Sequence, residues 1–437
     1  MALKLVMIQM GCSKNRVDGE VMLGQLSDRG FEIVEDIAQA DIAIINTCGF
    51  IDSAKQESID AILEAAEYKK TGRLKKLMVC GCLSQRYASE LAAELPEVDA
   101  FLGVNPFDVL CRTLDEMIAG ERPVCLTQGA RFPRQKRLLA ASSYSAYVKI
   151  SDGCDNRCSY CAIPLIRGSY SSRPYDDIMA ECRELAARGV TELTFIAQDT
   201  SRYGNDFEGH PLLLARLLNE ASMIEGIHWV RVLYCYPDTV NEELLDCISR
   251  NPKISPYLDL PLQHINDDLL HRMNRRGSKA QITRLLKLCR ERRITVRTTM
   301  IVGFPGETDA QFEELIEFVK QARFGRLGAF TYSPEEGTKA AGMPDQIDEQ
   351  VKASRLDRLM LTQQEISYET NRARIGSVCE VLTESTEDGT YIGRSLLEAP
   401  EVDGVIRFTS EKKLLPGQYV RVKLTDCDAY DMMGVAL

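Results

Sequence analysis

The sequence predicts an α/β protein with an N-terminal parallel α/β domain, a central partial (β/α)6 barrel and a small antiparallel β-barrel at its C-terminal end. Two blocks in which strand and helix patterns alternate predict the first two parts. A run of short strand patterns separated by Glu-Asp-Gly and Pro-Gly turns predicts the third. The length of 437 residues agrees with about three domains of ~150 residues each.

Residues 1–120 contain the first alternating block. Short apolar runs predict strands at 3–10, 42–46, 76–79 and 98–104, and apolar spacing of three and four predicts helices at 17–29, 52–70 and 84–95. Residues 121–141 carry Arg131, Arg134, Lys136 and Arg137 beside Pro133 and are predicted to form a linker. A solvated connector is favoured there over an RNA contact.

Residues 142–365 contain the second block, with strands predicted at 146–150, 192–197, 229–234, 257–260, 295–302 and 327–331. Helical patterns between them give six β/α units, and barrel chemistry collects at the carboxyl ends of such strands. Residues 371–437 are predicted to form the small barrel, with strands at 377–383, 389–394, 404–408 and 419–424.

Composition excludes several classes of protein. A hydrophobic content of 45%, no apolar run near the ~18–20 residues of a membrane span, and a start without a leader pattern favour a cytoplasmic globular protein. Fifteen cysteines in such a chain indicate reduced thiols and metal ligation rather than disulfides. A net charge of −11 disfavours broad docking on nucleic acid and suits a basic partner.

The most informative motif is the C-x3-C-x2-C triplet of Cys154, Cys158 and Cys161, directly after a predicted strand. Three thiolates on one loop can hold three irons of a 4Fe–4S cluster and leave the fourth iron open to chelate a small molecule. A structural zinc site and a chance cluster are the alternatives. Zinc prefers four nitrogen or sulfur ligands in paired knuckles, whereas all four histidines lie at least 49 residues from Cys161.

A second set consists of Cys12, Cys48 and Cys82, each of which follows a predicted strand of the first block and has a glycine beside it. Carboxyl ends of neighbouring parallel strands lie about 5 Å apart, so the three side chains can converge on one cluster. The alternative is three buried thiols that act as small hydrophobes. Cys80 is a rival of Cys82 because residues two apart share a strand face. Cys82 is preferred because it lies farther past the strand.

With both cysteine sets, and with the aromatic Tyr160 before the last cysteine of the triplet, the chain closely resembles the radical S-adenosylmethionine methylthiotransferases over practically its full length. The resemblance implies an N-terminal cluster domain, a radical barrel and a C-terminal TRAM domain. It also implies two 4Fe–4S clusters, one on each cysteine set. In this superfamily the open iron binds S-adenosylmethionine, and electron transfer cleaves it to a 5′-deoxyadenosyl radical.

Within the family, segments 11–15 (GCSKN), 46–53 (NTCGFIDS) and 259–264 (DLPLQH) resemble the RimO group, which modifies a ribosomal protein. The MiaB group, which modifies tRNA, tends to carry other residues at these places. Gly19 departs from the serine usual in the family's first motif. The resemblance implies methylthiolation of an aspartate β-carbon in small-subunit ribosomal protein S-twelve. S-adenosylmethionine would be both methyl donor and radical source, and an electron donor would be required.

Further cofactor contacts are expected at predicted strand ends of the barrel. Gln198, Gln263 and Gly303 suit contacts to the amino acid and ribose parts of S-adenosylmethionine, and Tyr160 is placed with them by the motif. The alternative for each is an ordinary loop residue. His264 is expected to be a structural histidine rather than an acid or base. No catalytic residue is assigned beyond the cluster ligands.

The substrate class has an internal test in the TRAM region. Residues 371–437 hold 8 Lys and Arg against 11 Asp and Glu, whereas an RNA-binding barrel is expected to have a basic face. A basic protein substrate is therefore favoured, a MiaB-type tRNA adenosine methylthiotransferase is the alternative, and direct RNA contact stays open. A non-catalytic iron–sulfur sensor would not need a six-unit barrel with an open-site triplet.

Overall fold

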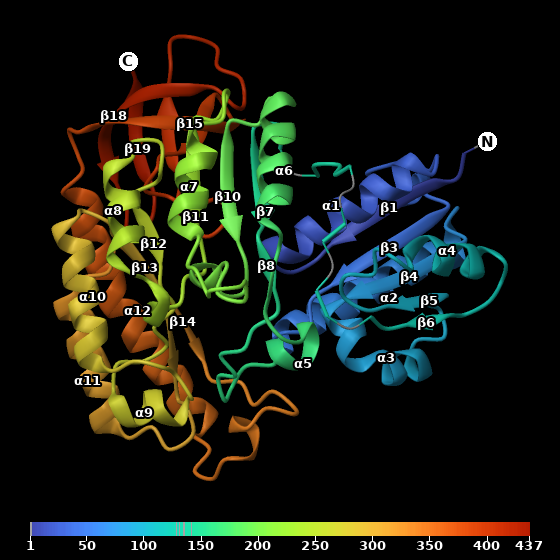
Figure 1. The fold of residues 1–437 in the computed structure, drawn as a ribbon, viewed down its shortest axis with the longest axis horizontal. Coiled ribbons are helices and arrows are strands. Elements are labelled where there is room, and N and C mark those ends of the chain that lie inside the picture. Colours follow the sequence, from blue (N-terminus) through green and yellow to red (C-terminus); the bar gives the residue numbers. More distant parts are fainter. Residues whose placement is uncertain (1, 128, 131, 134–135, 141) are drawn as a thin grey trace.

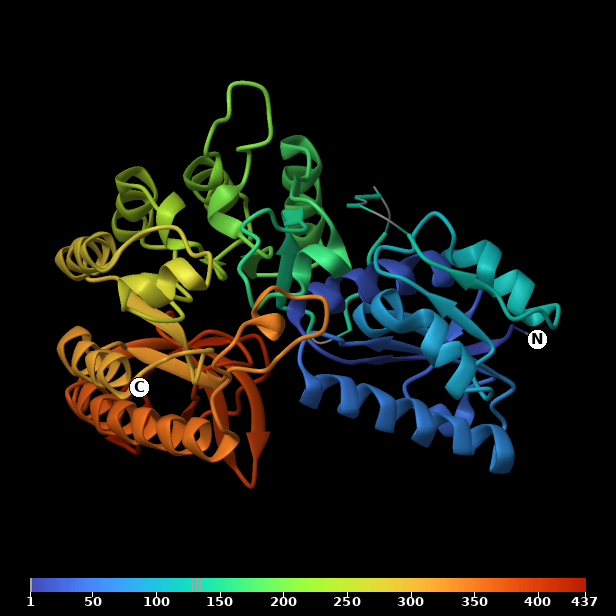
Figure 2. The ribbon, with the colours of Figure 1, turned by 90° about the horizontal axis from the view of Figure 1, so that it is seen from below.

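The computed structural model describes residues 2–127, 129–130, 132–133, 136–140 and 142–437. The N-terminal sheet domain lies beside the central barrel, and the C-terminal strands pack against one end of that barrel (Figure 1). The view from below shows the N-terminal domain and the barrel as neighbouring bodies in contact (Figure 2). No helix in this described part of the chain is long and apolar enough to cross a membrane.

The N-terminal domain is a parallel sheet with strand order β2-β1-β3-β4-β5-β6 over the described residues. Its strands are β1 (Lys4–Gln9), β2 (Glu32–Ile33), β3 (Ile42–Thr47), β4 (Lys76–Gly81), β5 (Ala100–Leu102) and β6 (Val124–Cys125). Its helices are α1 (Ser13–Asp28), α2 (Asp52–Thr71), α3 (Cys82–Glu94) and α4 (Leu110–Ile118). Helices α2 and α3 pack on one face of the sheet, and α1 and α4 pack on the other. Burial on both faces explains the uninterrupted apolar runs of β3 and β4.

The predicted strands and helices of this domain are present with shifted ends, while β2, β6 and α4 were not predicted. Strand β6 lies inside the predicted linker and pairs with β5 through Phe101 and Val124. Arg137 also differs from the expected solvated connector, because it is buried and paired with Glu20 and Glu181. Arg131 and Arg134 lie outside the described residues.

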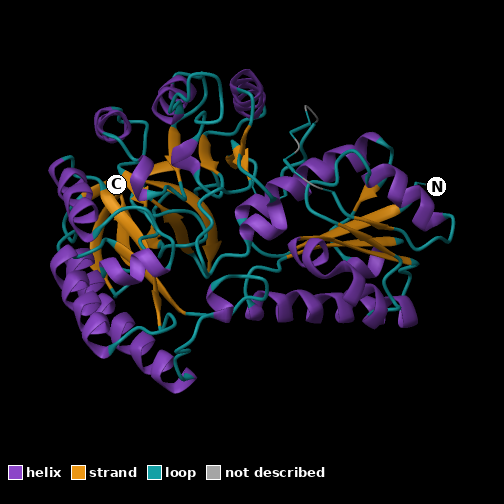
Figure 3. Cartoon of the chain, turned by 60° about the horizontal axis from the view of Figure 1, so that its bottom comes forward, coloured by secondary structure: helices purple, strands orange, loops and turns teal. Residues whose placement is uncertain are grey.

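The central region has six parallel strands in two sheets of order β11-β10-β7 and β12-β13-β14 across the described chain. They are β7 (Ser145–Lys149), β10 (Glu192–Ile196), β11 (Trp229–Val232), β12 (Tyr257–Asp259), β13 (Thr295–Val302) and β14 (Arg326–Thr331). The helices are α5 (Ile163–Arg167), α6 (Tyr175–Ala187), α7 (Leu214–Ser222), α8 (Glu242–Arg250), α9 (Asp267–Arg272), α10 (Lys279–Glu291), α11 (Asp309–Ala322) and α12 (Glu349–Arg372). Most of these helices cover the outside of the curved strands, which confirms a partial barrel (Figure 3). A two-stranded ribbon of β8 (Ser151–Asp152) and β9 (Ser171–Ser172) was not predicted.

The inside of the barrel is completed by the other two parts of the chain. Tyr147 and Tyr257, which come from strands β7 and β12, pack there with Val17 of α1 and with Ala399. Val17 belongs to the N-terminal domain, and Ala399 belongs to the loop between β16 (Thr390–Arg394) and β17 (Ile406–Thr409) of the C-terminal barrel. The three parts therefore share one core, and none of them forms it alone.

The C-terminal strands close into a barrel of order β15-β16-β17-β19-β18. They are β15 (Val378–Glu387), β16 (Thr390–Arg394), β17 (Ile406–Thr409), β18 (Tyr419–Cys427) and β19 (Met432–Ala436). Strand β19 was not predicted, and it pairs in parallel with β17, so one pair departs from the antiparallel pattern that was expected. Helix α12 runs without a break to Arg372 and leads directly into this barrel.

A buried ion cluster fastens the C-terminal barrel to the amino end of the central strands. The guanidinium of Arg394 donates to both carboxylate oxygens of Glu192, the first residue of β10, and also to Glu384. Burial acts to raise the pKa of Glu192, but the charge and hydrogen bonds of Arg394, together with the charge of Arg231 and a hydrogen bond from Ser145, outweigh it and lower that pKa to about 2. The carboxylate is therefore ionised at neutral pH, and Arg394 is the partner that contributes most to this.

Replacement of Arg394 by Met leaves the Glu192 carboxylate buried without this partner, so we expect a loss of about 3–5 kcal/mol in the free energy of unfolding at pH 7. Urea unfolding measures this loss. Because the pKa of Glu192 is lowered from 4.5 to about 2 in the folded state, the stabilisation is complete above pH 4.5 and disappears as the pH falls towards 2.

Arg407→Met is the matched control, because Arg407 lies in the same barrel but forms its ion pairs at the surface. This variant should lose less than about 1 kcal/mol. Equal losses in the two variants would contradict the importance of the buried pair.

Candidate functional site

The structure brings Cys12, Cys48 and Cys82 together at the carboxyl edge of the N-terminal sheet. The Sγ atom of Cys48 lies 3.2 Å from the point where a Cβ on Gly11 would stand, directly beside Cys12. Burial raises the pKa of the Cys82 thiol to about 12, and the charges of Cys12 and Cys48 add to this effect. Three thiols from three strand ends therefore share one space, and Cys12 is exposed at its edge.

Two glycines make this approach of the loops possible. Gly11 has φ +84°, and a Cβ there would lie 2.8 Å from the Cβ of Cys48. Gly81 has φ +98°, and a Cβ there would lie 2.5 Å from the carbonyl oxygen of Thr47. Both positions need a residue without a side chain, because the cysteine-bearing loops touch one another at these points.

The geometry separates Cys82 from its rival Cys80. Cys80 lies within β4, is fully buried in the core on the α1 side, and its Sγ is 3.8 Å from the Asn46 side chain. The turn at Gly81 ends the alternation of the strand, so Cys82 begins α3 and faces the other two cysteines. The shared face expected for residues two apart applies only inside a strand.

Cys12 stands at the N-cap of α1, where backbone N–H groups face its thiol. Desolvation acts to raise its pKa, but the cations of Lys14 and Arg167 and the N–H groups of Asn15 and Lys14 lower it overall. A helix N-terminus and nearby cations are the surroundings that favour a thiolate, the form that ligates metal. Asn15 also joins two of the loops, since its side chain donates to the Thr47 carbonyl at 2.7 Å.

Cys154, Cys158 and Cys161 lie on the loop after the carboxyl end of β7, as expected from the sequence. The segment after α9 fixes this loop, because the Ser159 N–H donates to the Met273 carbonyl at 2.9 Å and the Asn274 side chain donates to the Arg157 carbonyl at 2.8 Å. Burial raises the pKa of Cys154 to about 11, and the charge of Cys158 contributes. Burial and the same charge raise the pKa of Cys161. The three thiols are therefore neighbours.

The donors in both places fit an iron–sulfur cluster better than a single ion. Within the described ranges, no three His, Cys, Asp or Glu side chains are gathered closely enough to hold one metal ion. A cubane cluster takes each thiolate on a different iron, so its ligands are spread around a larger object. Three thiols without a fourth protein ligand suit such a cluster with one open iron.

Gln198 has a feature that suits a ligand. Its Oε1 atom is buried and has no hydrogen-bond partner, so it is an acceptor free to meet a donor from a bound molecule. Its neighbour Asp199 accepts a hydrogen bond of 2.8 Å from Asn156 of the cysteine loop. Gln198 therefore lies next to a residue that holds the triplet.

The other predicted contacts have different surroundings. Tyr160 is within 3.4 Å of the Arg275 guanidinium, whose Nη1 also lies 3.8 Å from the Sγ of Cys158. Gln263 has φ +72°, and its backbone bonds to strand β13. Gly303 packs against α12, where a Cβ would lie 2.3 Å from the Lys352 side chain, so packing alone accounts for this glycine. The cofactor roles of these residues stay predictions.

His264 has the structural surroundings that the sequence analysis preferred. It is fully buried, its Nε2 lies 3.1 Å from the Glu307 carboxylate, and its Nδ1 accepts the Asn266 N–H at 3.0 Å. Both ring nitrogens are therefore occupied by the protein.

Sequence reasoning missed a buried charge cluster between the N-terminal domain and the barrel. Asp18 of α1 pairs with Lys149 of β7 and, at 3.0 Å, with Arg167 at the end of α5. Asp152 pairs with the same two cations at 3.1 Å, and Asn105 donates to it at 2.8 Å. No local pattern in the sequence predicts this cluster, because its members come together only when the domains pack.

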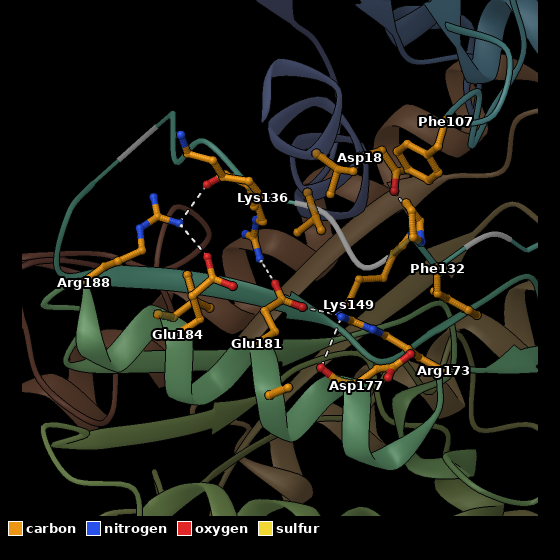
Figure 4. A pocket seen from close by; sticks show the side chains of 16 residues that line it. Asp18, Phe107, Phe132, Lys136, Lys149, Arg173, Asp177, Glu181, Glu184 and Arg188 are labelled. Carbon is orange, nitrogen blue, oxygen red and sulfur yellow. Dashed lines mark hydrogen bonds and ion pairs between the residues drawn. The ribbon is translucent and has the colours of Figure 1, made fainter. Parts of the chain in front are cut away.

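A cavity of about 520 Å³ borders this cluster on the side of the predicted linker, between α1 and α6. Figure 4 shows its charged lining, in which Glu181 lies close to Arg173 and Asp177 lies one turn before Glu181 on α6. None of the residues that line it is a cysteine. The cavity is therefore separate from both cysteine sets.

Comparisons with known proteins agree with the three parts of the fold. The family described as "Uncharacterized protein family UPF0004" matches residues 4–103, the Radical SAM superfamily matches 148–319, and the TRAM domain matches 375–437. Among solved structures, radical S-adenosylmethionine methyltransferase TsrM from Kitasatospora setae, with cobalamin and a [4Fe-4S] cluster bound, superposes with a TM-score of 0.57 at 16% identity. That likeness covers 78% of this chain and 74% of TsrM, and it shows the fold alone.

Curated relatives are much more similar in sequence. The ribosomal protein uS12 methylthiotransferase RimO of Clostridium kluyveri is 45% identical over 438 residues, which cover 99% of this chain and 98% of that protein. The protein of the same name from Thermoanaerobacter sp. is 47% identical over 430 residues, which cover 98% of each chain. The chain therefore belongs to the RimO family of radical S-adenosylmethionine methylthiotransferases, enzymes whose cofactors are S-adenosylmethionine and 4Fe–4S clusters.

Proposed function

We propose that this protein transfers a methylthio group to the β-carbon of an aspartate in ribosomal protein uS12, with S-adenosylmethionine as both methyl donor and radical source. The observation that carries the proposal is the position of the two cysteine sets on one interface. Cys82 of the N-terminal set packs with Ala162, the residue after Cys161 of the triplet, and with Ile166 of α5. A sulfur site and a radical site must lie near one another for a single aspartate to use both.

We assign one cluster to Cys154, Cys158 and Cys161 and the other to Cys12, Cys48 and Cys82. When bound, the first would supply the electron that cleaves S-adenosylmethionine, and the second would supply the place where the transferred sulfur is held. An aspartate β-carbon has no acidic proton, so the acid–base chemistry of side chains cannot activate it.

Residues of the protein close the interface between the domains and would orient S-adenosylmethionine. Arg86 of α3 donates to Glu335 at 2.8 Å, and Lys55 of α2 pairs with the same carboxylate at 2.9 Å, so the loop after β14 is tied to the N-terminal domain. Arg167 ties α5 to that domain on the barrel's other side. Contacts on both sides of the interface would limit the access of water to the radical site, and such exclusion prevents side reactions. Gln198, with its free acceptor, would orient S-adenosylmethionine.

Charge supports a basic protein as substrate. The whole chain carries a net charge of −11, and residues 371–437 have more acidic than basic side chains. Opposite charge speeds encounter with a basic ribosomal protein and opposes contact with tRNA. The C-terminal barrel contacts Glu192 at the amino end of the central strands, whereas the triplet follows the carboxyl end of β7. The TRAM barrel therefore lies at the end of the strands opposite to the triplet. A cytoplasmic location and an external electron donor belong to the same proposal.

The substrate assignment predicts a mass increase on a protein rather than on RNA. Anaerobically reconstituted enzyme is mixed with S-adenosylmethionine, sulfide and a strong reductant, together with uS12 in one reaction and unmodified tRNA in another. Mass spectrometry should find a methylthio group on one aspartate of uS12. Modification of tRNA alone would reject the substrate and favour the MiaB-type alternative, and a Cys158→Ala enzyme is the inactive control.

The ligand assignment predicts different outcomes for two cysteines that are two residues apart. Cys82→Ser should retain about half of the iron of the parent protein after reconstitution, because one of two clusters loses a ligand. Cys80→Ser should retain all of it, since Cys80 faces the core. Iron and sulfide analysis with absorption spectra measures this. Full iron in the Cys82 variant would refute the assignment.

The buried Oε1 atom of Gln198, which has no hydrogen-bond partner in the protein, predicts weaker cofactor binding in the variant Gln198→Leu. Loss of one hydrogen bond to the ligand should raise the Kd of S-adenosylmethionine about tenfold, which corresponds to roughly 1.4 kcal/mol. Equilibrium binding to the reconstituted enzyme measures this. Gln25→Leu is the control, because Gln25 also has a buried Oε1 without a partner but lies on α1 beside Phe107. Equal Kd values for the Gln198 variant and the parent would exclude the contact.

A further inference from the structure

Arg167 is the residue that reaches from the radical barrel into the N-terminal cysteine set. It ends the short helix α5, which begins two residues after Cys161, and its side chain is only 2% exposed. Its Nη2 atom donates to the Asn15 side chain at 2.7 Å and lies 3.8 Å from the Sγ of Cys82. The guanidinium thus stands against a thiol on the other side of the domain interface.

The position of this guanidinium is fixed from several sides. Its Nη1 atom is 3.0 Å from Asp18 and 3.1 Å from both oxygens of Asp152. Lys149 shares these two carboxylates, so two anions and two cations balance within the cluster. An arginine cannot lose its proton in a protein, so the charge is permanent. A planar donor held in this way cannot turn away from Cys82.

The local charge changes when the cysteines become ligands. Cys12, Cys48 and Cys82 must be thiolates to hold iron, and they add negative charge to a region where the carboxylates are already balanced. The cations that face them are Arg167 and Lys14, and the ammonium of Lys14 lies over the ring of Tyr234. Of these two cations, Arg167 lies within hydrogen-bonding range of a ligand sulfur, and it belongs to the other domain.

We propose that Arg167 is a positioning residue that completes the N-terminal cluster site from the barrel and raises the reduction potential of the cluster bound there. Net charge, hydrogen bonds to the sulfurs and solvent exposure set the potential of such clusters. A buried cation that donates towards a thiolate stabilises the reduced, more negative state. This inference rests on the proposed assignment of Cys12, Cys48 and Cys82 as ligands. The electronic properties of the sulfur site then depend on docking of the barrel.

A different arginine lies beside the triplet of Cys154, Cys158 and Cys161. The effect of Arg167 on the N-terminal cluster can therefore be measured separately. Arg275 lies 3.8 Å from the Sγ of Cys158 and donates to the Pro261 carbonyl at 2.5 Å. It contributes to the electrostatic surroundings of Cys161, whereas Arg167 contributes to those of Cys12 and Cys82. Each cysteine set therefore faces its own guanidinium, which is buried in Arg167 and partly buried in Arg275.

A purely structural role for Arg167 is the competing explanation, and Arg137 provides the matched control. Arg137 is also buried, also joins α1 to the barrel through carboxylates, and contacts Glu20 and Glu181. Among the described residues, the Arg137 guanidinium donates to carboxylates and to no thiol. Its removal costs a domain contact of the same kind without touching a cluster ligand.

The experiment uses the full-length protein with Cys154, Cys158 and Cys161 changed to Ala, so that only the N-terminal cluster is present. Arg167→Gln, Arg167→Lys and Arg137→Gln are made in this background and reconstituted without air. Iron content and the midpoint potential of the cluster, from a redox titration followed by EPR, are measured for each. We expect a lower potential in Arg167→Gln, a value closer to the parent in Arg167→Lys, and the parent value in Arg137→Gln.

An unchanged potential in Arg167→Gln, or an equal fall in Arg137→Gln, would overturn the proposal. If the Gln variant fails to hold a cluster, the Lys variant decides: a bound cluster supports the need for a cation, and equal loss refutes it. In the reverse background, with Cys12, Cys48 and Cys82 changed to Ala, Arg275→Gln should lower the potential and Arg167→Gln should leave it unchanged. Modification of uS12 is measured separately with the enzyme that retains all six cysteines. A potential shift in the Arg167 variant without uS12 modification by that enzyme would retain the role of Arg167 and reject the proposed substrate, and the opposite pair of results would do the reverse.

Discussion

The buried ion cluster between the N-terminal domain and the barrel is the constraint on which the candidate site depends. Asp18, Lys149, Asp152 and Arg167 have side chains that are at most 5% exposed, so each of them needs its partners. Such a cluster adds little net stability, because the cost of removing charges from water offsets their attraction. We infer that its main contribution is orientation, since another docking angle would leave buried charges unpaired. The same cluster holds α5 beside Cys82.

A shared apolar core reinforces this orientation. The interior of the barrel is incomplete until Val17 of the N-terminal domain and Ala399 of the C-terminal barrel enter it. The C-terminal barrel is fastened in turn through Glu192 and Arg394 at the amino end of the strands. The carboxyl end of β7, where the cysteine triplet follows, is thereby turned towards the N-terminal set. Each part has a core of its own, and one further apolar cluster receives residues from all three parts.

The local sequence pattern was sufficient to predict strands and the residues that follow them. The apolar runs of β3 and β4 and the cysteines after them were predictable, because burial on both faces dictates composition and strand ends dictate position. Two-residue strands such as β6 carry no periodicity, so the sequence could not reveal them. The close packing of Gly303 against Lys352 could not be predicted, because Lys352 lies on a helix distant in the chain. Arg137 was expected in solvent, yet carboxylates of two helices bury it. Arg167 could not be predicted at all, because its partners lie 15 to 152 positions away in the chain.

The central claim is that two cysteine sets, each with three thiolates, hold two clusters face to face across one interface. An anaerobic crystal structure of the reconstituted protein, with the irons located by their anomalous scattering, tests it most directly. The account predicts one cluster on Cys12, Cys48 and Cys82 and one on Cys154, Cys158 and Cys161, with the Arg167 guanidinium against Cys82. A single cluster, a ligand from Cys80, or an Arg167 side chain turned away from the N-terminal set would contradict it.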